Sequence, residues 1–300
     1  MELAITSTSM KLRDRAPVVF RGEDNWCFEQ IRSIGYDGVE LHIHDSSQLD
    51  RKQLKEELDQ FGLSLTSIGT GSAYGKDRVF LSSEDADVRQ AAIERIKGHI
   101  LTASDYPHAV VIIGLIKGKV SDCESRESYF ANLIPALREC AEEAGKYQVY
   151  LGLEVINRYE SDVINTVKEG LEFLEMVGSP WLQLHLDTYH MNIEESDIKK
   201  SIQSAKGKIC HVHVADNDRW FVGHGHYDFA ETLGALKEIG YTGAVSVESF
   251  GFPDMISSAR ASYENMRHIM NQLKGKAAVG TIKYGNSAAF SIRFSDFVIE

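Results

Sequence analysis

The stretch Asp85–Leu115, DADVRQAAIERIKGHILTASDYPHAVVIIGL, contains one complete unit of the pattern that decides the fold. Its first part carries apolar residues at helical spacing, namely Val88, Ala92, Ile93 and Ile96. Its last part, Ala109–Leu115, is a short run of mostly β-branched apolar residues. Apolar residues at helical spacing indicate an amphipathic helix, and a continuous apolar run indicates a strand covered on both faces. The stretch therefore predicts a helix followed by a buried strand.

The same alternation continues along the chain. Strand-like runs lie at Leu3–Ser7, Gly38–Ile43, Leu63–Gly69, Ala109–Leu115, Tyr150–Ile156, Leu182–Asp187, Ile209–Ala215 and Ala244–Ser249. Helix-like segments lie at 24–34, 50–60, 85–104, 126–145, 163–177, 195–205, 228–239 and 257–273. Alternating strands and helices favour a parallel sheet, and eight units allow the sheet to close into a (β/α)8 barrel. A doubly wound open sheet is the competing architecture, but it often carries a Gly-rich loop after its first strand, where this chain has Ser7-Thr8-Ser9-Met10.

The barrel pattern predicts one domain over residues 1–273. The segment 274–300 departs from the pattern, with two short β-like pieces at 280–284 and 289–294. This tail is consistent with a hairpin on the barrel, with a hairpin on a partner subunit, or with a poorly ordered end. Its role is not predicted.

The amino-acid composition argues against several classes of binding partner. The net charge of -12 and the lack of a basic run argue against a nucleic-acid partner, because such binding depends on clustered Lys and Arg. No apolar run reaches the roughly 20 residues that span a bilayer, so no membrane partner is expected. The start, Met1–Ser7, does not resemble a signal peptide. Four scattered cysteines, Cys27, Cys123, Cys140 and Cys210, are typical of buried free thiols and suit a reducing cytoplasm.

Ionisable residues end each of the last four predicted strands. They are Glu154, Asp187, His213 and Glu248. In a barrel of this kind the loops at the carboxyl ends of the strands build the active site. Three carboxylates there would repel one another and are costly to bury, and a divalent cation compensates both effects. Three oxygen ligands and one nitrogen ligand suit Mn²⁺ best, with Co²⁺, Mg²⁺ or Zn²⁺ as alternatives.

Three segments around these residues resemble the signature blocks of a known family. They are Leu153–Glu160, Asp187–Glu195 and His211–Arg219. The chain is similar to ketose 3-epimerases, such as D-tagatose and D-psicose 3-epimerases, within the xylose isomerase-like TIM barrel superfamily. The stretches Ser67–Tyr74 and Val111–Gly118 are more similar to a branch that acts on a keto-uronate, the 5-keto-L-gluconate epimerases.

The resemblance implies roles for individual residues. Glu154, Asp187, His213 and Glu248 match the family's ligands for one divalent metal ion, and Glu154 and Glu248 also match its catalytic acid/base pair. Glu160, His190 and Arg219 match positions that bind substrate. The substrate is then a small keto-sugar, a ketohexose or a keto-uronate, and we expect a homo-oligomer, either a dimer or a tetramer. Only the segment from Lys274 departs from the family pattern.

The chemistry that these residues imply is epimerisation beside a carbonyl group. One Glu removes a proton, a metal-stabilised enediolate forms, and the other Glu returns a proton to the opposite face. Lys117 follows the fourth strand and is a candidate counter-charge for a substrate carboxylate, although a solvated loop lysine is the simpler interpretation. Arg219 alternatively pairs with Asp216 or Asp218 at the surface.

Other histidines receive weaker interpretations. His211 shares a strand face with His213, which favours a place in the barrel core. His224 and His226 lie in a Gly-rich loop and are expected to be exposed. His42 and His44 end the second strand, where they can line the pocket.

Several other functions remain open from the sequence. An aldose–ketose isomerase of the hydroxypyruvate or xylose type shares the barrel and the metal. An inosose dehydratase-like lyase is a third enzyme class. Abasic-site endonucleases use the same barrel but need three metals and a basic surface. A sugar-binding barrel without catalysis is the non-enzymatic alternative.

Overall fold

The computed structural model describes residues 1–12 and 16–278, which form a closed barrel of parallel strands. The barrel strands are β1 (Glu2–Thr8), β3 (Gly38–His42), β4 (Ser64–Gly69), β5 (Val110–Ile113), β6 (Tyr150–Glu154), β7 (Leu182–Asp187), β8 (Ile209–Val214) and β9 (Ala244–Val247). They pair in chain order, and β1 also pairs with β9, which closes the sheet. The predicted (β/α)8 barrel is confirmed.

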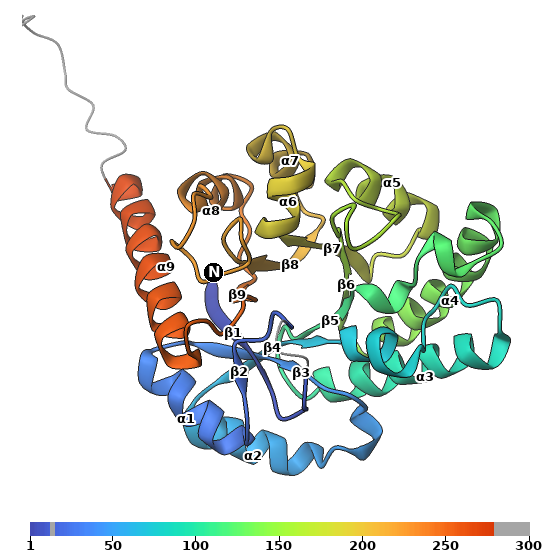
Figure 1. Cartoon of the computed structure of the whole chain (residues 1–300), viewed down its shortest axis with the longest axis horizontal. Helices are drawn as coiled ribbons and strands as arrows, with labels where there is room; N and C mark the ends of the chain where they lie inside the picture. The colour runs from blue at the N-terminus through green and yellow to red at the C-terminus, as the bar shows by residue number, and fades with distance from the viewer. Residues whose placement is uncertain (13–15, 279–300) are drawn as a thin grey trace, which may run out of the picture.

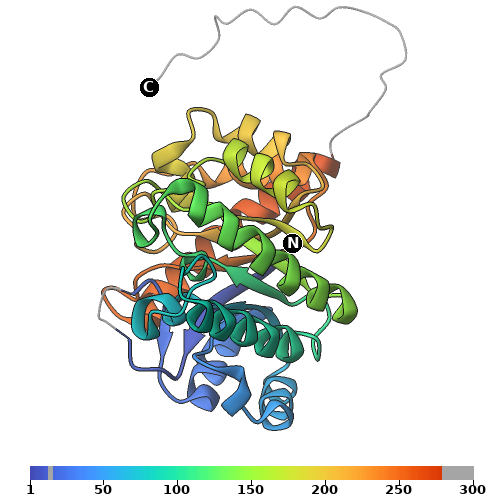
Figure 2. The same cartoon turned by 90° about the vertical axis from the view of Figure 1, so that its right-hand side faces the viewer.

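Helices surround this sheet on its outer face (Figure 1). They are α1 (Asp24–Ile34), α2 (Arg51–Phe61), α3 (Ala86–Ala103), α4 (Arg126–Tyr147), α5 (Val167–Val177), α6 (Thr188–Glu194), α7 (Ile198–Ser204), α8 (Phe229–Glu238) and α9 (Met255–Ala278). The last helix packs against both α8 and α1, so the end of the helical layer meets its beginning. The view in Figure 2 shows α3 and α4 side by side across one flank.

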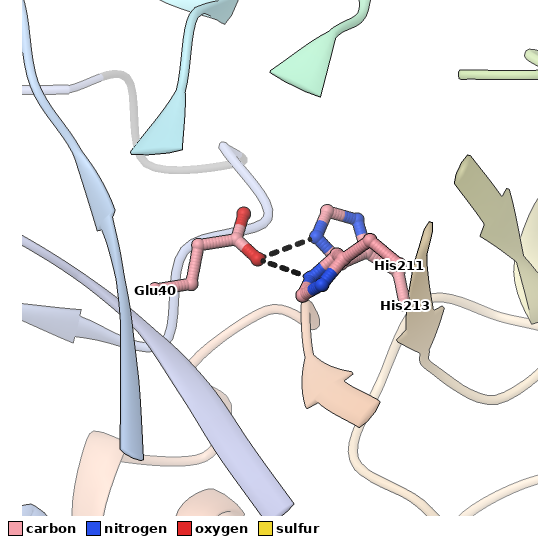
Figure 3. Close-up of side chains that lie close together, drawn as sticks. All are labelled: Glu40, His211 and His213. Carbon is pink, nitrogen blue, oxygen red and sulfur yellow. Dashed lines mark hydrogen bonds and ion pairs between the residues drawn. The ribbon is translucent and has the colours of Figure 1, made fainter. Parts of the chain in front are cut away.

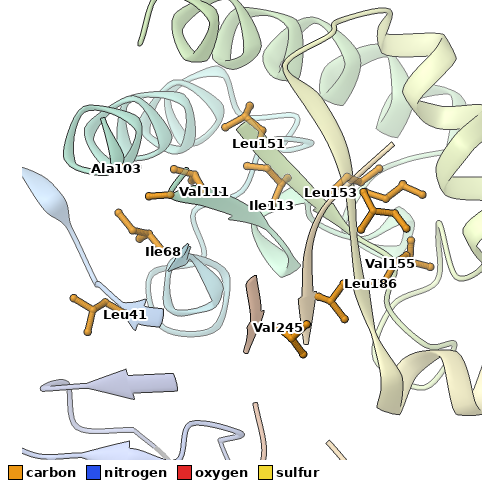
Figure 4. Close-up of a cluster of buried hydrophobic side chains, with 14 of the residues drawn as sticks. Leu41, Ile68, Ala103, Val111, Ile113, Leu151, Leu153, Val155, Leu186 and Val245 are labelled. Carbon is orange, nitrogen blue, oxygen red and sulfur yellow. The ribbon is translucent and has the colours of Figure 1, made fainter. Parts of the chain in front are cut away.

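Side chains along each strand alternate between two environments. Those facing the helices are apolar and fully buried, and Figure 4 shows part of this layer, including Val111, Leu151, Leu153 and Leu186. The intervening positions face the interior of the barrel, and several of these are polar, for example Glu40, Ser67, His185 and His211, all 0% exposed. Because successive residues of a strand point to opposite faces, apolar runs interrupted by single polar residues produce this division.

Besides short helical turns in the loops, the structure adds one strand and one α-helix that the sequence pattern did not predict. β2 (Phe20–Arg21) is a two-residue strand beside β1, and α6 is a seven-residue helix directly after β7. Both are too short to show a periodic pattern. The side chain of Asp187 begins α6 by accepting a hydrogen bond from the backbone N–H of Tyr189 at 2.7 Å.

Glycines follow two of the helices. Gly35 and Gly240 follow α1 and α8 with φ of 116° and 79°, a backbone region that favours glycine.

The predicted β-like pieces at 280–284 and 289–294 lie outside the described residues. All four cysteines are free; Cys27 and Cys140 are buried, as expected, whereas Cys123 and Cys210 are partly exposed. Within the described ranges, no helix combines the length and apolarity needed to cross a membrane.

Candidate metal centre and active site

Four strand ends bring the predicted ligands together. Glu154 and Asp187 are the last residues of β6 and β7, His213 lies near the end of β8, and Glu248 directly follows β9. Asp187 and His213 are partners in the β7–β8 register. One ligand atom from each of the four residues lies within 4.8 Å of the others, and all four residues are buried. Because parallel strands end at one rim of the barrel, residues far apart in sequence converge there.

Two buried atoms in this cluster test whether a cation fits. Asp187 Oδ2 and His213 Nδ1 lie 3.8 Å apart and make no hydrogen bond among the described residues, although Arg219 Nη2 forms an ion pair with the oxygen at 3.1 Å. Glu248 Oε2 lies 3.3 Å from the same His213 Nδ1. Ligand atoms about 2.0–2.2 Å from one ion lie roughly 3–4 Å from each other. The spacing, the two buried atoms without a hydrogen bond and the three carboxylates therefore fit one divalent cation.

Local charges keep the two carboxylates at β6 and β7 ionised. Burial alone would raise the pKa of Glu154, but the nearby His190 and His213 together outweigh burial and lower it. Burial opposes ionisation of Asp187 as well, and the Arg219 guanidinium, 3.1 Å away, lowers its pKa. For His213, burial would lower the pKa, but Glu40 and Glu248 raise it well above its usual value. The cluster thus combines ionised oxygens with a histidine whose surroundings favour its protonated form.

Gly114 leaves room for the carboxylate of Glu154. A Cβ placed on Gly114, just after β5, would lie 2.4 Å from Glu154 Oε2. Such a contact is too short for non-bonded atoms, so any larger residue at this position would displace the carboxylate. The glycine that follows β5 is therefore part of the site.

The family model described as "Xylose isomerase-like TIM barrel" matches residues 28–272, which include all four predicted ligands. The chain belongs to this xylose isomerase-like family. An L-ribulose 3-epimerase from Methylomonas sp. (strain DH-1) is 34% identical over 250 residues, covering 81% of this chain and 85% of the relative.

Solved structures agree with this family. A structure of L-ribulose 3-epimerase superposes with a TM-score of 0.80 at 27% identity, covering 94% of this chain and 99% of the other. A D-allulose 3-epimerase from Methylomonas sp. in complex with D-allulose superposes with a TM-score of 0.75 at 27% identity, covering 89% and 96%. The resemblance to ketose 3-epimerases is confirmed, and so is the prediction that the chain is a carbohydrate epimerase.

In this xylose isomerase-like barrel, two of the three substrate-binding residues implied by the resemblance contact the four predicted metal ligands, which we call the ligand cluster. His190 is 2% exposed, and its Nε2 lies 3.6 Å from Glu154 Oε1. Arg219 pairs through Nη2 with Glu248 and lies close to Asp187, as described above. Its guanidinium therefore faces into the barrel mouth, away from the alternative surface pairing with Asp216 or Asp218. The backbone of Arg219 has φ of 65°, a costly conformation outside glycine that is often found at functional sites.

Glu160 lies farther out, on the exposed loop after β6. Its neighbour Arg158 pairs with Glu194 at 2.6 Å. Glu160 instead accepts a hydrogen bond from Asn157 Nδ2 at 3.0 Å, and the same amide lies 2.7 Å from His190 Nδ1. Asn157, which the sequence interpretation did not single out, thus joins two of the predicted substrate-binding residues.

Lys117 is buried, so the interpretation as a solvated loop lysine is wrong. It lies in a short 3₁₀ turn, Leu115–Lys117, and is 0% exposed. Its ammonium group donates to the backbone carbonyls of Gly114 and Glu154 at 3.3 and 3.2 Å. Burial lowers the pKa of Lys117 to about 8. The side chain therefore ties the ends of β5 and β6 together beside the ligand cluster.

Sequence reasoning missed Glu40, a carboxylate inside β3. It is 0% exposed and contacts both His211 and His213 of β8, as Figure 3 shows. The available signal was an ionisable residue within the apolar run Gly38–Ile43, the same signal that revealed Glu154 and Glu248. It was overlooked because Glu40 lies in the middle of its strand rather than at the end.

Four of the other histidines agree with their predicted places. His211 is buried in the barrel interior, and His224 and His226 are exposed. His42 Nε2 lies 3.3 Å from Glu40 Oε1 and 3.7 Å from Glu248 Oε1, so it lines the site. His44 lies beside Asp77 at 3.3 Å.

A separate cavity of about 550 Å³ opens at the opposite end of the barrel. Residues at the starts of the strands line it, including Leu65, Val110, Tyr150, Ile209 and Ala244. None of the four predicted ligands borders it.

Proposed function

We propose that the chain is a divalent-metal-dependent 3-epimerase of a small keto-sugar. The observation that carries this proposal is the convergence of Glu154, Asp187, His213 and Glu248 within 4.8 Å at the rim of the barrel. The relatives named as L-ribulose and D-allulose 3-epimerases support the same reaction.

The four converging residues would hold the cation. We propose Mn²⁺ as the ion, with Co²⁺, Mg²⁺ or Zn²⁺ as alternatives that the same mixed donor set accepts. When bound, a divalent cation supplies Lewis-acid stabilisation for the negative charge that develops on the substrate oxygens.

The two glutamates would carry the proton transfers. Glu154 and Glu248 approach from β6 and β9, on two sides of the barrel mouth. One carboxylate removes the proton from the carbon next to the carbonyl, which leaves a planar enediolate. The other, protonated, returns a proton to the opposite face, so the configuration at that carbon is inverted. Glu154 lies beside His190, and Glu248 forms an ion pair with Arg219. Because their surroundings differ, the two glutamates can hold one proton between them.

His190, Arg219 and Glu160 would orient the substrate. The guanidinium of Arg219 offers a planar fork of donors to a substrate oxygen. The Nε2 atom of His190 faces the ligand cluster, because Asn157 contacts its other ring nitrogen. Glu160, on the exposed loop, is placed to reach hydroxyl groups at the outer end of the sugar.

The substrate is proposed as a ketohexose or a keto-uronate. For Lys117 we propose first the role that its contacts support, which is to hold the strand ends of β5 and β6. Pairing with a substrate carboxylate is the second proposal for this residue. Replacing Lys117 with Ala tests it, because a carboxylate contact predicts a larger loss with a keto-uronate than with a neutral ketose. Equal losses on both substrates would remove that role.

The decisive experiment follows the reaction in D2O. The metal-depleted chain is incubated with a panel of ketoses and keto-uronates, with and without added Mn²⁺, and products are followed by NMR. The proposal predicts Mn²⁺-dependent formation of the C3 epimer with deuterium at C3 and no aldose. Formation of an aldose would favour the isomerase alternative, and metal-dependent binding without turnover would favour a sugar-binding barrel.

Two wider expectations accompany this function. We propose a homo-oligomer, a dimer or a tetramer, which sedimentation equilibrium tests. We also propose the cytoplasm as its location, a choice supported by four cysteines that form no disulfide.

A further inference from the structure

Glu40 occupies the centre of a buried polar network below the ligand cluster. Its Oε2 accepts a hydrogen bond from Ser67 Oγ at 2.7 Å. The same oxygen lies 3.0 Å from His211 Nε2 and 2.8 Å from His213 Nε2. In Figure 3 the carboxylate reaches from β3 across the barrel interior towards both imidazoles. In the closed sheet β1 and β9 separate β3 from β8, so this contact crosses the barrel interior between strands that are not neighbours.

This contact decides which nitrogen of His213 faces the ligand cluster. A carboxylate only accepts hydrogen bonds, so His213 Nε2 must carry the hydrogen that it donates to Glu40. The lone pair of neutral His213 is then on Nδ1. That atom lies 3.3 Å from Glu248 Oε2 and 3.8 Å from Asp187 Oδ2 and has no hydrogen-bond partner within the described chain.

We propose that Glu40 is the positioning residue of the metal centre, which holds His213 in the tautomer and orientation that present Nδ1 to the cation. This inference rests on the proposed function, since it takes His213 as a metal ligand. Ligand histidines commonly donate their second N–H to a carboxylate, which fixes the ring and strengthens the ligand. Here the carboxylate comes from the far side of the barrel and is itself held by Ser67.

A second cation site made of Glu40, His211 and His213 is the competing interpretation. The geometry disfavours it, because Glu40 Oε2 already receives three donors at 2.7–3.0 Å. A cation there would also require His213 to bind through Nε2. Its Nδ1 would then carry a hydrogen directed at Glu248, in place of a lone pair.

The test compares Mn²⁺ affinity in Glu40→Gln, His211→Asn and the unaltered chain, measured by competition with a chromophoric chelator. Glu40→Gln is expected to weaken Mn²⁺ binding by roughly 10–100-fold, with one ion still bound per chain and most activity restored at saturating Mn²⁺. His211→Asn is the matched control, because it disturbs the same network but keeps the contact between His213 and Glu40. Its Mn²⁺ affinity is expected to stay within a few-fold of the unaltered chain.

A spectroscopic readout separates positioning from general stability. In the Zn²⁺-loaded, ¹⁵N-His-labelled protein, His213 should show a slowly exchanging Nε2–H resonance that Glu40→Gln shifts or broadens. Ser67→Ala removes one donor to Glu40 and serves if Glu40→Gln does not fold. It should shift the same resonance and weaken Mn²⁺ binding several-fold.

Three results would overturn the inference. They are unchanged Mn²⁺ affinity in Glu40→Gln, a His213 hydrogen on Nδ1 in the loaded protein, and loss of one of two bound ions on substitution. If the unaltered chain bound no divalent cation at all, the proposed function would fail first. Failure of the inference alone would leave an active, metal-dependent epimerase whose affinity does not depend on Glu40.

Discussion

Asp187 and His213 are register partners on β7 and β8, and they direct Oδ2 and Nδ1 towards each other across 3.8 Å. Both atoms are buried, and neither has a hydrogen-bond partner among the described residues. A buried polar atom without a hydrogen bond is costly, and the ion pair of Asp187 Oδ2 with Arg219 Nη2 at 3.1 Å offsets only part of that cost. A cation between Oδ2 and Nδ1 would satisfy both atoms. The proposed metal dependence rests on this pair.

Replacing Asp187 with Asn should abolish most metal binding. The substitution removes one proposed anionic ligand and one of the two carboxylates that pair with Arg219, so activity should fall by roughly 10²–10³-fold. Under the proposed function, added Mn²⁺ should raise the melting temperature of the unaltered chain by binding its folded state, and this rise should disappear in the variant. Equilibrium dialysis and thermal unfolding measure both effects. A variant that still binds one Mn²⁺ tightly would contradict the assignment.

Replacing Glu154 or Glu248 with Gln should remove one of the two proton-transfer groups. Activity should fall by roughly 10²–10⁴-fold in either variant, because each epimerisation needs both groups. One variant should nevertheless exchange the C3 proton of one epimer with solvent in D2O, where the remaining carboxylate acts as the base. Glu172→Gln, on the exposed face of α5, is the control and should retain full activity. Unimpaired epimerisation in both variants would exclude the two-base scheme.

Metal affinity should increase with pH across the neutral range. In the metal-free chain, burial would lower the pKa of His213, but Glu40 and Glu248 raise it well above 6.5. A cation must displace this proton, so apparent affinity should fall about tenfold per pH unit below that pKa. Stability of the metal-free chain has the opposite slope. The His213 contribution is fully present below pH 6.5 and is lost as pH rises through the folded-state pKa.

Mn²⁺ titrations between about pH 6 and 9, with proton release measured by calorimetry in two buffers, check this dependence. Asp187 and Glu154 do not add to it, because their pKa values are lowered and both stay ionised in this range. An affinity that does not change with pH would show that His213 is not a ligand.

Lys117 should make stability depend on pH at alkaline values. Burial lowers its pKa from 10.5 to about 8, so between these values the unfolded chain binds more protons than the folded chain. The free energy of unfolding should therefore rise with pH from about 8 to 10.5, by roughly 3 kcal/mol from this residue alone. Lys117→Met should remove the rise. Urea unfolding of both metal-free proteins at several pH values measures it, and parallel profiles would contradict the burial of a charged Lys117.

Replacing Gly114 with Ala should damage activity more than stability. The new Cβ would lie 2.4 Å from Glu154 Oε2, which must move. A displacement of about 1 Å in a reacting group costs up to roughly 10²-fold in rate. Gly234→Ala is the matched control, because its Cβ would meet only Leu273 at 4.0 Å. Steady-state kinetics and thermal unfolding of both variants separate the two effects, and full activity in Gly114→Ala would show that Glu154 tolerates the shift.

The sequence by itself determined the barrel and the convergence of its four strand-end residues. Runs such as Ala109–Leu115 alternate with amphipathic segments, and this local periodicity is sufficient because each strand is covered on both faces. Parallel strands end at one rim, so the order of strands along the chain is enough to place Glu154, Asp187, His213 and Glu248 together. The segments around them also carried the resemblance to the family.

Only the tertiary structure decided which residues support that site. Glu40 lies mid-strand, and nothing in its neighbourhood along the chain indicates that it faces His211 and His213 from across the barrel. Lys117 follows a strand like any loop lysine, yet its ammonium is enclosed between two strand ends. Periodicity predicts which face of a strand is buried, because that depends on neighbours in sequence. Contacts across the barrel interior depend on the stagger and closure of the sheet, which arise only when all eight strands have paired.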